Sequence, residues 1–137
     1  MNEQNNIQVI QQIFACFGQG DVAGILDRLS DDATWHITPV DNVPYTGTRS
    51  GHAGAAEFFS LLAQCEDVLQ FEPRDFIAQG DKVVVHVQYA ARVKATGREY
   101  TSYLLQVFTV QNGKITGVDE YTDTAAIAAA YAKTQSA

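Results

Sequence analysis

The chain has 137 residues and a mass of 15.0 kDa, which predicts a single domain large enough to bury a core. Its net charge of −7 at pH 7 leaves no basic surface to neutralise phosphates, so neither nucleic acid nor an anionic membrane is expected as a partner. Residues 1–8 are polar and contain no signal-peptide core, and no apolar run reaches the roughly 18 residues of a membrane-spanning helix. We therefore expect a cytoplasmic protein.

The N-terminal part of the chain predicts two helices. Four apolar residues recur at helical spacing and indicate the first helix: Ile7, Ile10, Phe14 and Phe17. This helix should stop at Gly18–Gly20. Asp21 is then a suitable N-cap for a second helix that should continue to Leu29 and end at residues 30–32.

A short strand and a third helix are expected next. Residues 34–37 predict the strand, residues 41–50 a loop, and residues 52–64 a helix with one apolar side. Cys16 and Cys65 lie in helix-like segments among apolar neighbours. This placement favours free buried thiols over a disulfide, which nothing in the sequence supports.

The second half of the chain predicts an antiparallel sheet. The expected strands cover residues 68–78, 82–95, 98–110 and 115–122, with a bend in the first at Pro73. Asn112-Gly113 separates two β-rich runs and indicates a hairpin, because both residues accept positive φ angles. An alanine-rich helix should follow over residues 125–133. Helices first and hairpins later are typical of the α+β class, here with a curved sheet wrapped around the helices and a pocket between them.

Taken together, these segments resemble the NTF2-like superfamily, and within it the SnoaL-like and ketosteroid-isomerase-related proteins. The resemblance runs nearly end to end and rests on the order and spacing of several short segments: Gly20-Asp21, residues 30–36, Tyr45-Thr46-Gly47, Phe58-Phe59, residues 79–85, residues 112–115 and residues 120–123. It implies a cone-shaped domain and a homodimer through the outer face of the sheet. It does not fix an activity, because this fold hosts isomerases, cyclases, hydratases and non-enzymatic binders.

The same resemblance argues against a true ketosteroid isomerase. The position that matches that enzyme's oxyanion-hole tyrosine is Ile13, and the position that matches its general base lies near Ile37. Its buried acid matches Gln106. Asp41, in the loop that follows, could occupy a similar space to the base and stays a second candidate for that role.

The last strand contains the sharpest candidate, Glu120. A gapless count against ketosteroid isomerase implies that Glu120 faces the cavity and that its neighbour Asp119 faces outward. Asp123 comes two residues before the alanine-rich helix and is expected to cap it. SnoaL-type polyketide cyclases have a catalytic base at what looks like the position of Glu120. A carboxylate in an apolar cavity has a raised pKa, which suits proton abstraction next to a carbonyl group. The alternative is an acid that pairs with Arg or Lys or that faces a wet cavity mouth.

Other side chains are weaker candidates. Gln106 could donate to a substrate oxygen or be a buried amide satisfied by Glu120. His36 could act as an acid or base near the cavity mouth, although a lone histidine is more often structural. Tyr89 should point inward and needs a partner, which could be ligand, water or Gln106. The expected ligand-contacting residues are Trp35, Ile37, Tyr45, Phe58, Tyr89, Leu104, Phe108 and Val118.

Three hypotheses follow. The first is an enzyme without a cofactor that acts on a small hydrophobic carbonyl compound, with Glu120 moving a proton and Gln106 stabilising the oxyanion. The second is a non-catalytic protein that binds a small apolar molecule, and the third is a dimerisation module with a vestigial cavity. No cluster of His, Cys or acidic residues has the spacing of metal ligands, so no metal is expected.

Overall fold

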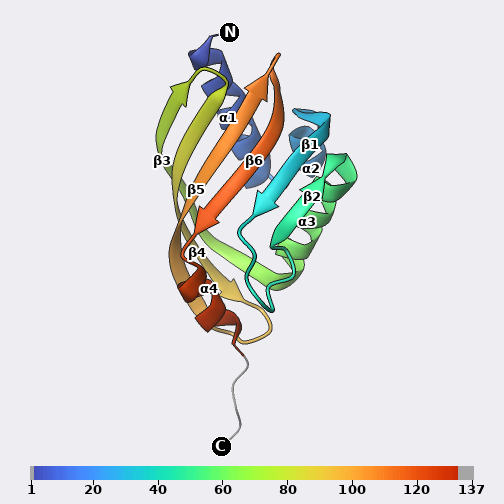
Figure 1. The fold of residues 1–137 in the computed structure, drawn as a ribbon. Coiled ribbons are helices and arrows are strands. Elements are labelled where there is room, and N and C mark those ends of the chain that lie inside the picture. The colour runs from blue at the N-terminus through green and yellow to red at the C-terminus, as the bar shows by residue number, and fades with distance from the viewer. Residues whose placement is uncertain (1, 133–137) are drawn as a thin grey trace, which may run out of the picture.

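The structure, a computed structural model, describes residues 2–132 (Figure 1). Its helices in this part of the chain are α1 (Glu3–Gly18), α2 (Val22–Leu26), α3 (Gly51–Cys65) and α4 (Thr124–Tyr131). Its strands are β1 (Leu29–Ile37), β2 (Gly47–Ser50), β3 (Glu66–Gln79), β4 (Lys82–Val93), β5 (Glu99–Gln111) and β6 (Lys114–Thr122). No helix within residues 2–132 is both long and apolar enough to cross a bilayer.

The strands form one curved sheet in the order β2-β1-β6-β5-β4-β3. β1 runs parallel to β6, and the other neighbouring pairs are antiparallel. In Figure 1, α1 lies behind the sheet and α4 lies at its lower end. Asn112 and Gly113 have φ angles of 53° and 77°, which confirms the hairpin between β5 and β6. The α+β class and the mostly antiparallel curved sheet are confirmed.

Two predicted boundaries were wrong, and a third lies outside the described residues. The second helix ends at Leu26, because Leu29 already pairs with Ile115 of β6 and lies in the core. The predicted loop over residues 41–50 contains β2, which pairs with β1 and so gives that strand a second neighbour. The last helix ends at Tyr131, and its predicted end at Lys133 lies outside the described residues.

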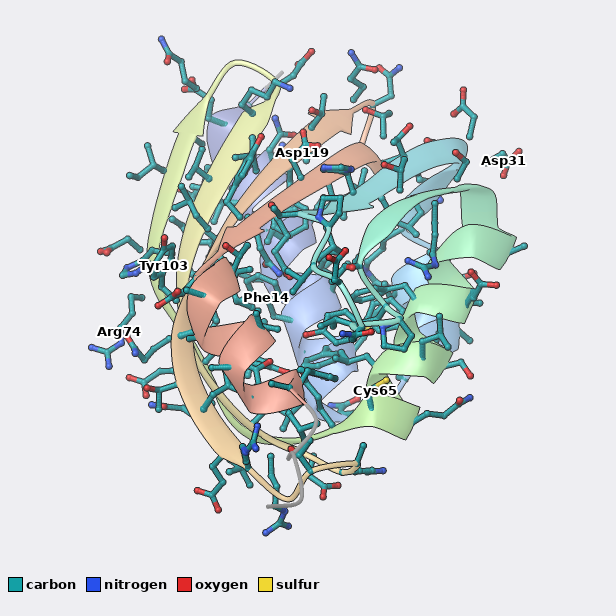
Figure 2. All side chains as sticks on the ribbon, turned by 60° about the horizontal axis from the view of Figure 1, so that its bottom comes forward. Phe14, Asp31, Cys65, Arg74, Tyr103 and Asp119 are labelled. Carbon is teal, nitrogen blue, oxygen red and sulfur yellow. The ribbon has the colours of Figure 1, made fainter. Side chains whose placement is uncertain are left out.

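Alternation along the strands divides the sheet into a buried and an outer face. Val85, Val87 and Tyr89 of β4 are buried and face the helices, whereas the His86 side chain is 44% exposed. Figure 2 shows the same division: Phe14 of α1 reaches toward the inside of the molecule, and Tyr103 projects from the outer face. The predicted inward directions of Tyr89 and Glu120 are therefore confirmed.

Side chains at two helix starts confirm the predicted caps. The Asp21 carboxylate accepts a hydrogen bond from the Gly24 amide at 2.9 Å, and the Asp123 carboxylate accepts one from the Ala126 amide at 3.1 Å. Such caps satisfy amides that have no partner within the helix. Cys16 and Cys65 are free thiols, as expected, but they are half-buried rather than buried.

Candidate functional site

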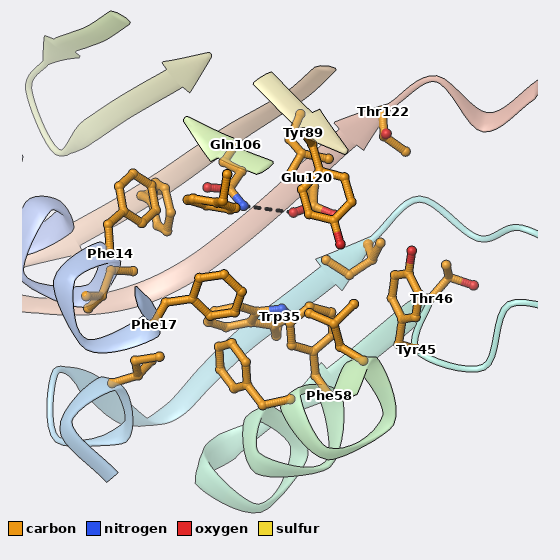
Figure 3. A pocket seen from close by; sticks show the side chains of 18 of the residues that line it. Phe14, Phe17, Trp35, Tyr45, Thr46, Phe58, Tyr89, Gln106, Glu120 and Thr122 are labelled. Carbon is orange, nitrogen blue, oxygen red and sulfur yellow. Dashed lines mark hydrogen bonds between the residues drawn. The ribbon is translucent and has the colours of Figure 1, made fainter. Parts of the chain in front are cut away.

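A cavity lies between the concave face of the sheet and the helices (Figure 3). The empty space among its lining side chains, including the part open to solvent, has a volume of about 710 Å³. The part of this space that the centre of a water molecule can reach is only about 60 Å³. The cavity is therefore narrow and suits a small ring better than a large polycyclic molecule.

Glu120 and Gln106 lie side by side on the sheet wall of this cavity. They are opposite one another in the β5–β6 register, and Gln106 Nε2 donates a hydrogen bond to Glu120 Oε1 at 2.8 Å. Both side chains are buried. Figure 3 shows this bond and the aromatic rings that face it.

Burial raises the pKa of the Glu120 carboxyl to about 7. The hydrogen bond from Gln106 lowers this pKa, and the negative charge of Glu66 raises it further, but loss of solvation is the largest effect. Glu120 is not part of any ion pair formed by residues 2–132. The alternative of a closed ion pair with Arg or Lys is thus contradicted.

Two buried polar atoms in the cavity wall have no hydrogen-bond partner within residues 2–132. They are Trp35 Nε1, a donor, and Gln106 Oε1, an acceptor. Leaving such an atom unpaired costs about 1–3 kcal/mol. The cavity therefore contains one unused donor and one unused acceptor close to a carboxylate.

A second buried acid, Glu66, receives four tyrosine hydroxyl groups. Tyr89 donates to Oε1 at 2.7 Å, while Tyr45, Tyr100 and Tyr131 donate to Oε2 at 2.9, 2.7 and 2.5 Å. Burial raises the pKa of all four hydroxyl groups, and the negative Glu66 raises it further, so they remain protonated donors. This cluster joins the loop before β2, the start of β3, strands β4 and β5, and helix α4.

Sequence reasoning missed Glu66. The acidic pair Glu66-Asp67 stands between a helix and a strand, where acids are usually solvated, but Glu66 is only 3% exposed. The predicted partners of Tyr89 were also wrong, since its hydroxyl group bonds to Glu66 instead of ligand, water or Gln106. One signal was available: buried tyrosines each need a hydrogen-bond partner, and no basic or amide cluster in the sequence could serve all of them.

Most of the predicted site residues meet at the cavity. Besides Glu120 and Gln106, its lining includes Trp35, Ile37, Tyr45, Phe58, Tyr89, Leu104 and Phe108. Val118 is buried but does not line the cavity. Asp41 is exposed in the loop after β1, and His36 Nδ1 lies 2.6 Å from the Thr48 hydroxyl group, so the structure does not bring these two residues to the cavity.

A metal site is not evident in the part of the chain that the structure describes. Within residues 2–132, no three His, Cys, Asp or Glu side chains are grouped so that they could hold a metal ion. The polar groups that line the cavity are the Glu120 carboxyl group, the Gln106 amide, the Trp35 indole N–H group, and the hydroxyl groups of two threonines and three tyrosines: Thr46, Thr122, Tyr45, Tyr89 and Tyr100.

Comparisons with known proteins identify the family. The sequence profile of the SnoaL-like domain matches residues 10–118, whereas no curated protein matches the chain. An NTF2-like protein from Burkholderia xenovorans LB400 is 35% identical, with 96% of this chain and 99% of that one covered and a TM-score of 0.89. TerC, crystallised with polyporic acid, is 31% identical over 93% of this chain and 98% of its own, with a TM-score of 0.81. An NTF2-like protein from Burkholderia pseudomallei K96243 is 23% identical, covers 97% of this chain and 100% of its own, and shares the fold at a TM-score of 0.85. The chain therefore belongs to the SnoaL-like family of the NTF2-like superfamily.

Proposed function

We propose that this protein is a cofactor-independent acid–base enzyme that binds a small, mostly apolar carbonyl compound in its cavity. The observation that carries this proposal is the position of Glu120, a buried carboxyl group among aromatic rings whose pKa is raised to about 7. A group with a pKa near the working pH can both accept and return a proton, which is the requirement for general acid–base catalysis.

The proposed reaction is the transfer of a proton at a carbon next to the carbonyl group. Ionised Glu120 removes the proton, the C–H electrons pass into the new C=C bond, and the carbonyl oxygen becomes an enolate oxygen. Protonated Glu120 then returns the proton to the same carbon or to another carbon of the conjugated system. No electron acceptor or second substrate is required for this exchange.

Gln106 has a different part in this proposal from the one expected from the sequence. Its amide N–H group bonds to Glu120 Oε1, so we assign it the positioning of the carboxylate rather than the stabilisation of the substrate oxyanion. The bond also fixes the direction of the Gln106 side chain, because the amide nitrogen must face the carboxylate.

The similarity to TerC supports a small-molecule occupant. That protein is 31% identical over nearly its whole length and was crystallised with polyporic acid. A cavity lined by Trp35, Phe58, Phe59 and other rings would hold an aromatic compound through dispersion and edge-to-face contacts. The ligand of this chain need not be the same compound.

The test is proton exchange at the α carbon of small aryl ketones, followed by NMR in D₂O near pH 8. We expect exchange catalysed by the wild-type protein and at least about a hundredfold slower exchange with Glu120→Gln. Glu72→Gln is the matched control, because Glu72 is exposed on β3 and does not line the cavity. Equal rates for Glu120→Gln and the wild type would refute the enzymatic function, and ligand binding without exchange would support the non-catalytic alternative.

We also propose that the protein forms a homodimer through the outer face of its sheet. Tyr103 and Leu105 of β5 and Tyr121 of β6 are exposed there, at 46%, 36% and 49%, and Leu105 is paired with Tyr121 across the two strands. Adjacent exposed apolar and tyrosine side chains are typical of a protein interface.

A further inference from the structure

The unpaired atoms of Trp35 and Gln106 describe the polar group that the cavity accepts. Trp35 Nε1–H needs an acceptor, and Gln106 Oε1 needs a donor. The two residues are 6% and 7% exposed, so bulk solvent does not supply these partners. Both residues line the cavity, and a molecule inside it is the natural source of the missing hydrogen bonds.

Gln106 cannot satisfy its oxygen by turning its amide around. The bond from Nε2 to the ionised Glu120 carboxylate directs Oε1 away from that carboxylate. A rotated amide would place two oxygen acceptors against each other. Gln106 therefore presents an acceptor to the cavity whenever Glu120 is ionised, which is the form that removes a proton.

Three neighbouring strands place these groups around one point. Glu120 is on β6, which has β1 with Trp35 on one side and β5 with Gln106 on the other. Figure 3 shows the indole of Trp35 beneath Glu120 and the amide of Gln106 beside it. A ligand at Glu120 would thus meet a donor from one side and an acceptor from the other.

We propose that the cavity recognises an α-hydroxy ketone, whose carbonyl oxygen accepts from Trp35 Nε1–H and whose hydroxyl group donates to Gln106 Oε1, with the C–H bond between them facing Glu120. This inference rests on the proposed function, which leaves the class of carbonyl compound open. A plain ketone satisfies only the indole, and a simple alcohol has no carbon acidic enough for Glu120 to deprotonate. Water can satisfy the same two atoms, but a ligand with its own donor and acceptor replaces water without loss of either bond.

The same contacts assist the chemical step. When Glu120 removes the proton from the hydroxyl-bearing carbon, the C–H electrons form a C=C bond and the carbonyl π electrons move to oxygen. Trp35 Nε1–H then stabilises this enolate oxygen, which is the role that sequence analysis gave to Gln106. The hydroxyl group keeps its proton and its bond to Gln106. Return of the proton from Glu120 to the same carbon restores the starting compound, so atoms and charge balance without a co-reactant.

The test is a comparison of four small probes that share one phenyl ring. Phenacyl alcohol has both groups, acetophenone lacks the hydroxyl group, 2-phenylethanol lacks the carbonyl oxygen, and phenacyl methyl ether has an oxygen that cannot donate. We expect phenacyl alcohol to bind the wild-type protein about tenfold more tightly than each of the other three, as measured by calorimetry. Equal affinities, or no binding by any probe, would overturn the inference.

Variants assign the preference to each residue. Trp35→Phe should remove the preference for phenacyl alcohol over 2-phenylethanol, and Gln106→Met should remove its preference over the methyl ether. Phe58→Leu is the control, because Phe58 lines the cavity and contacts the Trp35 ring without a polar atom. It should weaken all four probes by a similar factor and leave their ranking unchanged. A ranking that survives both Trp35→Phe and Gln106→Met would contradict the inference.

Failure of this inference can be distinguished from failure of the proposed function. Exchange of α protons in acetophenone that depends on Glu120, with no preference for phenacyl alcohol, would leave the proposed function intact and remove the hydroxyl requirement. The expected ranking without any exchange would support recognition of the α-hydroxy ketone and remove catalysis. Because the wild-type ranking is measured without any substitution, a variant that fails to fold cannot leave the inference undecided.

Discussion

The bonds between Glu66 and its four tyrosines allow a graded prediction of stability. Tyr89 is the only one of these tyrosines that bonds to Oε1, whereas Tyr45, Tyr100 and Tyr131 share Oε2. Removal of the Tyr89 hydroxyl group should therefore leave Oε1 buried without a partner. Removal of the Tyr45 hydroxyl group leaves Oε2 with two donors.

The expected costs follow from this difference. A hydrogen bond to a charged group contributes about 1.5–3 kcal/mol, and an unsatisfied buried acceptor costs more than a shared one. We expect Tyr89→Phe to lower the free energy of unfolding by about 3 kcal/mol and Tyr45→Phe by about 1–1.5 kcal/mol. Ser60→Ala is the control, because the Ser60 hydroxyl group is exposed on α3, outside the cluster and the proposed dimer interface, and its removal should change stability by less than about 0.5 kcal/mol.

The assay is urea unfolding at pH 7, followed by circular dichroism at fixed protein concentration. The concentration must be constant because any dimer would contribute to the measured stability. Equal losses for Tyr89→Phe and Tyr45→Phe would refute the unequal sharing of the two carboxylate oxygens. A Tyr89→Phe protein as stable as the Ser60→Ala control would refute the whole cluster as a source of stability.

Three further predictions concern pH and assembly. Because the four buried tyrosines have raised pKa values, their contribution to stability is complete below about pH 10 and is lost above it, by roughly 5–6 kcal/mol in total at pH 11. Absorbance at 295 nm should show tyrosinate forming together with unfolding. Ionisation of all six tyrosines in the folded protein would contradict this prediction. Because the pKa of Glu120 is raised, the folded state loses stability as pH rises from about 4.5 through 7. Glu120→Gln should therefore be about 3 kcal/mol more stable than the wild type at pH 8 and nearly as stable as the wild type at pH 4.5. Equal stability of the two proteins at both pH values would show that the Glu120 carboxylate is not buried in its charged form. Leu105→Glu should convert the proposed dimer into monomers in light scattering, while Gln11→Glu, which adds the same charge at an exposed position of α1, should leave it a dimer; a wild-type monomer would end the dimer proposal.

Much of the fold follows from local signals in the sequence. Strand alternation placed Gln106 and Glu120 on the same face, because a side-chain period of two leaves little freedom once the hairpin at Asn112-Gly113 is fixed. The helix caps at Asp21 and Asp123 were also predictable, because a cap involves residues only three positions apart. β2 was not predictable, because residues 47–50 form a strand only when β1 lies beside them.

The candidate site was less accessible from the sequence wherever it depends on distant pairs. The partner of Tyr89 is 23 positions away in the chain, and that of Tyr131 is 65 positions away, so no spacing rule connects either residue to Glu66. The free indole nitrogen of Trp35 could not be predicted at all, because an unpaired atom is a property of everything packed around it. The inward carboxylate of Glu120 was therefore predictable from the sequence, whereas the unpaired atoms around it are visible only in the packed structure.

The two buried glutamates differ in their hydrogen-bond partners, and this difference gives Glu66 a structural role and Glu120 a chemical one. Glu66 receives four hydroxyl donors, so its carboxylate oxygens are engaged with the protein and remain fixed behind the rings of Tyr45, Tyr89 and Tyr100. Glu120 receives one amide donor within an apolar cavity, and its pKa is raised to about 7 by burial and by the charge of Glu66. The hydrogen bonds from the tyrosines thus hold the negative charge of Glu66 in place, and this charge makes Glu120 more basic. Because the tyrosine hydroxyl groups are bonded to Glu66, these residues present their rings to the cavity instead of free hydroxyl groups. In a Glu66→Gln protein, Glu120 should therefore become an active base at a lower pH than in the wild type. The measurement is the midpoint of the pH–rate profile for α-proton exchange. An unchanged midpoint in a folded variant would show that the two carboxylates act independently.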